Sequence, residues 1–157
     1  MRHCYFLALI GVLLLPLSIS AQIIQDGVLS KCEGLSGRYV VPDEVTKIDN
    51  FAFFTSSVTE VVIGKNVQEI GNAAFQNCMK LESITFATGS KLQRIGDDVF
   101  SDCPKLTTIA LPEGLMRMGV RTFWLNESLK QITLPTTLDT LPKYLSLIHI
   151  SEPTRLL

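Results

Sequence analysis

The chain has 157 residues, which is enough for one domain, and its 14 basic and 15 acidic residues give a formal net charge of −1. The charges are mixed along the sequence, and no cluster of Lys and Arg provides the basic face that a nucleic-acid partner requires. Four cysteines in the whole chain are too few and too scattered for a small disulfide-stapled scaffold. Composition therefore excludes a nucleic-acid-binding protein and a disulfide framework.

The first 21 residues have the layout of a secretory signal peptide. A short start with Arg2 is followed by an apolar run from Cys4 to Leu17 and then by small residues that end at Ala21. The run is too short to span a bilayer comfortably, although an uncleaved membrane anchor stays open as the alternative. No later apolar stretch is long enough to span, so we expect a secreted or cell-surface protein with no membrane span after signal removal.

A repeat of about 23 to 25 residues follows. It reads VTEVVIGKNVQEIGNAAFQNCMK from Val58, LESITFATGSKLQRIGDDVFSDCPK from Leu81, LTTIALPEGLMRMGVRTFWLNES from Leu106 and LKQITLPTTLDTLPKY from Leu129. An earlier copy is visible in YVVPDEVTKIDNFAFFTSS. One such unit cannot bury its apolar residues alone, so neighbouring units must stack. The sequence predicts a repeat solenoid of short parallel β-strands, joined by turns and by short helical or irregular segments.

Each part of the unit has a physical role. The motif L-x-x-I-x-L ends in two apolar residues that are two positions apart, and this spacing places both on one face of a strand. The motif L-x-x-I-G adds a second extended piece, and its glycine stands where the chain must bend or pack closely. One phenylalanine per unit then fills the interior. These predicted core plugs are Phe53, Phe75, Phe100 and Phe123.

These motifs, five in phase, resemble the leucine-rich repeats of the BspA-like class, which is named after a bacterial surface antigen. The resemblance covers residues 26–144, and Cys32 stands where that family more often has an aromatic residue. We therefore predict an N-terminal cap and first repeat over residues 22–57 and further repeats over 58–144, of which the last is truncated. The resemblance implies a leucine-rich-repeat protein that binds an extracellular protein, or another macromolecule at a host or cell surface, without catalysis or a cofactor.

A column of small residues follows the plugs. Three positions after each phenylalanine stand Ser56, Cys78, Cys103 and Asn126, which stacking would place side by side as a structural ladder. The ladder predicts hydrogen bonds to the local backbone, while a disulfide between Cys78 and Cys103 stays open as an alternative. No cysteine pair has the spacing of zinc ligands, so we expect no metal site.

Histidine-dependent catalysis is excluded from the repeats, because His3 and His149 are the chain's two histidines and both lie outside residues 22–144. The carboxylate pair Asp97 and Asp98 is interpreted as part of a solvated turn. The sequence therefore predicts a binding protein and no enzyme in this portion. Two alternatives stay open: a targeting arm for an enzyme whose catalytic domain is missing, and a structural spacer.

Candidate ligand-facing residues are the outward positions of the two extended pieces. The first row is Glu60, Ser83, Thr108 and Gln131, beside Val62, Thr85, Ala110 and Thr133, and the second row is Glu69, Arg94, Arg117 and Thr140. Trp124 is a further candidate interface anchor. Cross-strand packing is the alternative role for the Ser and Thr positions.

The repeat period stops after Tyr144. Aligned on the other units, the fifth unit has Ser146 where the phenylalanine should stand. Residues 145–155, LSLIHISEPTR, resemble the translation of a sequencing adapter used in tagmentation libraries. We therefore expect residues 145–157 to be a non-native tail.

Overall fold

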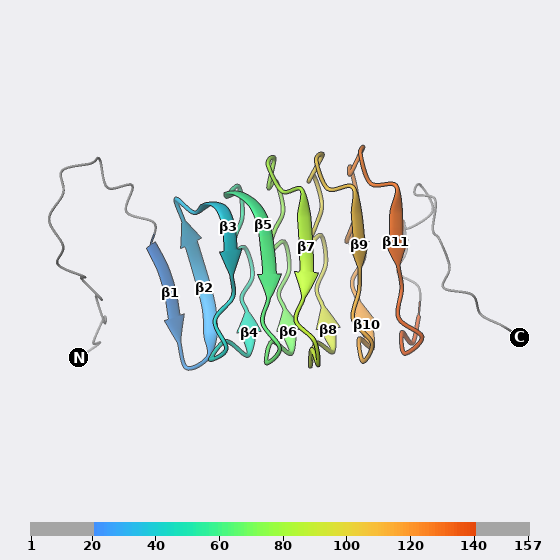
Figure 1. Ribbon diagram of the computed structural model, residues 1–157, viewed down its shortest axis with the longest axis horizontal. Coiled ribbons are helices and arrows are strands. Elements are labelled where there is room, and N and C mark those ends of the chain that lie inside the picture. Colours follow the sequence, from blue (N-terminus) through green and yellow to red (C-terminus); the bar gives the residue numbers. More distant parts are fainter. Residues whose placement is uncertain (1–20, 141–157) are drawn as a thin grey trace, which may run out of the picture.

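The computed structural model describes residues 21–140, a stack of coils along one long axis. Strand β1 lies at one end of the stack and β11 at the other (Figure 1). The predicted signal peptide, apart from Ala21, and the predicted non-native tail lie outside the described residues. Each coil places its elements beside the equivalent elements of the next coil, as the sequence period requires.

One side of the stack is a six-stranded sheet in the order β1-β2-β4-β6-β8-β10. Strand β1 pairs with β2 in antiparallel fashion, and all later neighbours in this sheet are parallel. The strands are β1 (Ala21–Gln25), β2 (Val28–Glu33), β4 (Lys47–Ile48), β6 (Glu69–Ile70), β8 (Arg94–Ile95) and β10 (Arg117–Met118). The four short ones are the L-x-x-I-G pieces of the repeat.

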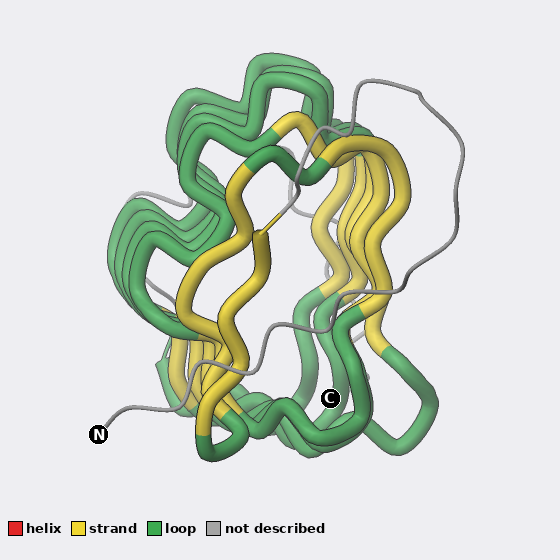
Figure 2. Tube along the Cα trace, turned by 90° about the vertical axis from the view of Figure 1, so that its left-hand side faces the viewer, coloured by secondary structure: helices red, strands yellow, loops and turns green. Residues whose placement is uncertain are grey.

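A second row of parallel strands lies on another side of the coil (Figure 2). It contains β3 (Ser36–Val40), β5 (Ser57–Ile63), β7 (Ser83–Phe86), β9 (Thr108–Ala110) and β11 (Gln131–Thr133). Hydrogen bonds join β3, β5 and β7 into one sheet and β9 and β11 into another, with β7 packed beside β9. The outward side of β5, β7, β9 and β11 is called the strand face below.

The short helical segments that were predicted as one form of the connections do not occur in residues 21–140. After each L-x-x-I-G piece the chain makes a six-residue turn around the plug instead. These phenylalanine turns are residues 51–56, 73–78, 98–103 and 121–126. The first and fifth residue of every one has a positive φ, between 53° and 60°. Two left-handed residues only four positions apart prevent a right-handed helical turn from forming.

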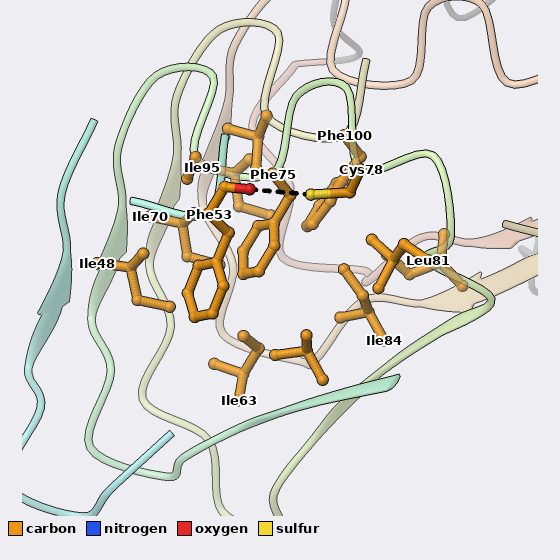
Figure 3. Close-up of a cluster of buried hydrophobic side chains, with 14 of the residues drawn as sticks. Ile48, Phe53, Ile63, Ile70, Phe75, Cys78, Leu81, Ile84, Ile95 and Phe100 are labelled. Carbon is orange, nitrogen blue, oxygen red and sulfur yellow. Dashed lines mark hydrogen bonds between the residues drawn. The ribbon is translucent and has the colours of Figure 1, made fainter. Parts of the chain in front are cut away.

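The plugs form a continuous aromatic stack inside the coils (Figure 3). Ring centroids are 4.5 Å apart between Phe53 and Phe75, and 5.6 Å apart for each of the next two pairs toward Phe123. The rings lie between the isoleucines of the two-residue strands and the apolar residues of the longer strands (Figure 3). Phe53, Phe75 and Phe100 are completely buried. Burial of each ring contributes roughly 2 to 3 kcal/mol, so the stack is a main source of stability.

Close approach between coils explains the glycine of L-x-x-I-G. A Cβ placed on Gly96 would lie 2.3 Å from Asn72 Oδ1 and 2.8 Å from the Asn72 backbone nitrogen. Such distances are shorter than van der Waals contact, so a side chain here would push two coils apart. The glycine is required by spacing between coils, since its φ is not in the left-handed region.

Candidate functional site

A shallow groove lies on the strand face, over β7, β9 and β11. Its volume is about 770 Å³, which is within the usual range for ligand sites. The floor is formed by outward residues of the three strands, chiefly Ser83, Thr85, Thr108, Ala110, Gln131 and Thr133. Three of the four residues predicted as the first ligand-facing row therefore lie together in one depression, and the fourth, Glu60, lies on the neighbouring strand β5.

One wall of the groove is the loop Ala87–Ser90, which is absent from the predicted ligand-facing residues. It belongs to the second full unit, which is two residues longer than its neighbours, and this extra length was the available signal. Gly89 lies at the tip with a φ of 74° and open space around it. An insertion in one repeat commonly maps to a loop on one face of a solenoid.

The groove contains little free charge. Its single acidic lining residue is Glu113, whose carboxylate accepts hydrogen bonds from the Thr136 backbone nitrogen at 3.2 Å and from its hydroxyl at 3.1 Å. Beside the groove, Glu60 on β5 pairs with Arg38 at 3.5 Å. The remaining polar lining consists of hydroxyl and amide groups, which both donate and accept hydrogen bonds. The site is therefore suited to a ligand that presents uncharged hydrogen-bonding groups.

The other candidate residues lie elsewhere on the coil. Glu69, Arg94 and Arg117 are on the six-stranded sheet, away from the groove. Trp124 lies in the last phenylalanine turn, with 45% of its surface exposed, and the Arg121 guanidinium lies 5.8 Å from its ring centroid. The structure thus divides the predicted ligand-facing residues among three separate surfaces.

The predicted ladder residues form a column whose hydrogen bonds follow one rule. The Cys78 thiol donates to the Phe53 carbonyl oxygen at 3.1 Å (Figure 3), and the Cys103 thiol donates to the Phe75 carbonyl oxygen at 3.2 Å. In the next coil the Asn126 amide donates to the Phe100 carbonyl oxygen at 2.7 Å. Cys78, Cys103 and Asn126 therefore each bond the carbonyl of the plug in the preceding coil, whereas the hydroxyl of Ser56, in the first turn, lies 3.4 Å from the Cys78 sulfur. These bonds supply acceptor partners inside the stack, where an unpaired carbonyl group is costly; the Phe53 carbonyl oxygen also accepts from the Ser56 backbone nitrogen at 2.9 Å.

Both column cysteines are free thiols in the structure, and so is Cys32. The hydrogen bond with Cys78 and burial together raise the pKa of the Cys103 thiol. Burial raises the pKa of the Cys32 thiol to about 12. A thiol with a raised pKa is a poor nucleophile, since the thiolate is the reactive form. The raised pKa values thus assign Cys103 and Cys32 to packing. The pKa of Cys78 is instead lowered by its hydrogen bonds with Cys103 and Ser56, and this buried thiol is held in the column by its bond to the Phe53 carbonyl oxygen.

A second ladder went unnoticed in the sequence. Asn50 Oδ1 accepts from the Asn72 backbone nitrogen at 2.7 Å, and Asn72 Oδ1 accepts from the Asp97 backbone nitrogen at 2.9 Å. Asp97 Oδ1 in turn accepts from the Val120 backbone nitrogen at 2.9 Å. The signal was present as Asn or Asp two positions after the isoleucine of three successive units. Asp97 is thus a structural link between coils.

We also searched the described part of the chain for metal-binding clusters and for membrane-spanning helices. Within residues 21–140, no three side chains of His, Cys, Asp or Glu lie close enough to hold a metal ion. The same residues contain no helix of the length and apolarity needed to cross a membrane. The groove on the strand face gathers several of the predicted ligand-facing residues and is the candidate binding site in residues 21–140.

The repeat geometry agrees with a family match. Residues 18–146 match six copies of the BspA type leucine rich repeat region. Because this match covers most of the sequence, the chain belongs to the BspA-type leucine-rich-repeat proteins. The predicted family and the predicted solenoid are thereby confirmed, and a search of curated proteins found no significant match.

Several bacterial proteins of solved structure share this fold. The T. pallidum leucine rich repeat protein TpLRR is 24% identical, with a TM-score of 0.54 over 77% of this chain and 71% of that one. The pneumococcal vaccine antigen PcpA is 22% identical, with a TM-score of 0.67 over 87% of this chain. A leucine rich cell surface protein from Faecalibacterium prausnitzii is 23% identical, with a TM-score of 0.51 over 74% of this chain. The chain spans 38% of PcpA and 41% of the F. prausnitzii protein, and these likenesses show the fold.

Proposed function

We propose that this chain is a secreted or cell-surface binding module that recognises an extracellular protein through its strand face. The observation that carries the proposal is the groove across β7, β9 and β11. Backbone hydrogen bonds join β5 to β7 and β9 to β11, and β7 and β9 lie side by side at the junction of the two sheets, so outward side chains of both sheets face the groove. Repeat proteins commonly bind along such extended surfaces.

Two further points support this role. The predicted signal peptide favours export, and one structural neighbour is described as a leucine rich cell surface protein. Residues 22–144 also lack histidine, so the commonest general base is unavailable there. Binding or adhesion without catalysis is the function that fits these features together.

The experiment compares two adjacent threonines. Thr108→Arg places a long cation in the groove, whereas Thr107→Arg places the same side chain on an exposed residue outside its lining. Both proteins, with the unmodified chain, are tested by biolayer interferometry against a panel of purified extracellular-matrix and bacterial surface proteins. We expect at least one saturable partner whose affinity falls tenfold or more with Thr108→Arg and stays within twofold with Thr107→Arg.

Equal effects of the two substitutions on every partner would contradict the strand face as the binding surface. Export is tested separately, by expressing the open reading frame in a bacterial host and by measuring the protein in the medium and its protease accessibility on intact cells. Retention in a protease-protected compartment would contradict the proposed location.

A further inference from the structure

The six-stranded sheet carries a row of charged side chains, one from each two-residue strand. In coil order they are Lys47, Glu69, Arg94 and Arg117, and each is a register partner of the next. Lys47 Nζ lies 3.3 Å from Glu69 Oε1, so the first two charges compensate each other. The last two have the same sign, and both side chains are exposed.

The two arginines lack acidic partners. Within residues 21–140 neither guanidinium makes a hydrogen bond or an ion pair with another side chain. Of the carboxylates on neighbouring coils, Glu69 pairs with Lys47 at 3.3 Å, and Asp139, whose backbone nitrogen donates to the Met116 carbonyl oxygen at 3.1 Å, makes no ion pair with either arginine. Neighbouring strands lie about 4.8 Å apart, so the side chains begin close together. Like charges directly opposite each other on paired strands lower stability.

Elsewhere in this molecule, charged side chains of adjacent coils have opposite signs. Charges in adjacent coils pair with opposite charges at several places, for example Arg38 with Glu60 and Lys65 with Asp43. A glutamate at position 117 would continue the alternation of sign that begins at Lys47. The arginine instead places a second cation beside Arg94, whose register partner on the other side is Glu69. Groups that lower stability without a structural reason are characteristic of binding sites.

We propose that Arg94 and Arg117 form a docking site for an acidic segment of a protein partner, with one carboxylate held between the two guanidinium groups. Guanidinium groups donate planar, paired hydrogen bonds that match a carboxylate, and such charge-assisted bonds are strong. A bound carboxylate would also relieve the repulsion between the two side chains. The inference uses the protein partner of the proposed function but a different surface, because neither arginine lines the groove.

The test uses the purified full chain and a poly-L-glutamate peptide as the probe. Binding is measured by isothermal titration calorimetry at low and moderate salt for the unmodified chain, Arg94→Gln, Arg117→Gln and Arg117→Glu. Lys130→Gln is the matched control, because Lys130 is an exposed cation away from this row. We expect saturable, salt-sensitive binding that Arg94→Gln and Arg117→Gln each weaken at least tenfold and Lys130→Gln by less than twofold.

Arg117→Glu separates a docking role from a structural one. It should abolish peptide binding and at the same time raise the urea midpoint of unfolding, because it restores alternating charges along the row. A lower midpoint for this variant would overturn the inference, and so would equal losses of peptide binding for Arg117→Gln and Lys130→Gln or a lack of binding by the unmodified chain.

Heparin serves as the second probe. If heparin binds more tightly than the peptide through the same two arginines, the acidic-protein assignment is overturned in favour of a sulfated polysaccharide. Thr108→Arg should leave peptide binding unchanged, since it alters the groove. The outcome for this docking site is therefore distinguishable from the outcome for the strand face.

Discussion

The phenylalanine turns are nearly the same in every coil, whereas the outward residues of the strand face differ from coil to coil. Every turn has the same backbone shape, with two left-handed residues around one buried ring and a ladder side chain at its end. The strand face keeps its backbone but changes its outward residues from coil to coil: Glu60, Ser83, Thr108 and Gln131. The comparison indicates that the turns specify the fold, and that the outward residues of the strand face can vary to bind a ligand without loss of the fold.

The largest expected effect is a break in the aromatic stack. Phe75→Ala removes a completely buried ring that has a stacked neighbour on each side. We expect a loss of about 3 to 5 kcal/mol in the free energy of unfolding, measured by urea denaturation. Phe54→Ala is the control, because that side chain is 42% exposed and should cost less than about 1 kcal/mol. Similar losses for both would contradict the assignment of Phe75 to the core.

Close packing between coils gives the next effect. Gly96→Ala introduces a Cβ that would lie 2.3 Å from Asn72 Oδ1. Overpacking of this kind costs roughly 1 to 3 kcal/mol, which urea denaturation would detect. Gln93→Ala, at an exposed position of the same unit, should change stability by less than about 0.5 kcal/mol. A neutral Gly96→Ala would show that the coils are less tightly stacked than the structure indicates.

Burial of the thiols predicts a dependence on pH. The pKa of Cys32 is raised from 9.0 to about 12 in the folded chain, so the unfolded chain loses this proton first as pH rises. Stability from this group is thus complete below pH 9 and falls as pH rises toward 12. By pH 10 the expected loss is about 1 kcal/mol, and Cys32→Ala should reduce the slope. A slope that is unchanged in the variant would exclude Cys32 as the cause.

The smallest effect is a gain in stability from relief of backbone strain. Thr55 is exposed and β-branched, yet its φ is 59°, which is a costly conformation for such a residue. Thr55→Gly should raise the free energy of unfolding by about 1 kcal/mol, as measured by thermal denaturation. Thr59→Gly, in strand β5, is the matched control and should lower it. A loss at both positions would mean that the Thr55 side chain stabilises the turn.

The strands and the buried phenylalanines could be predicted, because the same apolar motif recurs in each unit of the sequence. Periodic apolar residues identified the two extended pieces, and Phe53 to Phe123 lie where one plug per coil requires them. Of the two forms expected for the connections, helical or irregular, the irregular one is present in residues 21–140. The sequence could not choose between them, because the left-handed positions at Phe51, Ala73 and Arg121 share no residue type. The Asn72 ladder was missed for a similar reason, since its bonds join residues 22 to 25 positions apart.

The candidate site was predictable only in part. Alternation along a strand gives the outward direction of Ser83, Thr108 and Gln131, which was enough to place them in one row. It does not give the depth of the groove, which depends on the loop at Gly89 and on Glu113, each of which follows the carboxyl end of its strand. It also cannot separate Trp124 from the strand face, because that requires the path of the intervening turn.

The most direct test of the division between turns and strand face is a urea unfolding measurement on one triple variant. Ser83→Lys, Thr108→Glu and Gln131→Lys together replace the outward row on β7, β9 and β11 and continue the alternating charges of Arg38 and Glu60. If the turns specify the fold, the free energy of unfolding should stay within about 1 kcal/mol of the unmodified chain. A loss of about 3 kcal/mol or more would contradict the account, because it would show that the strand face is itself required for folding.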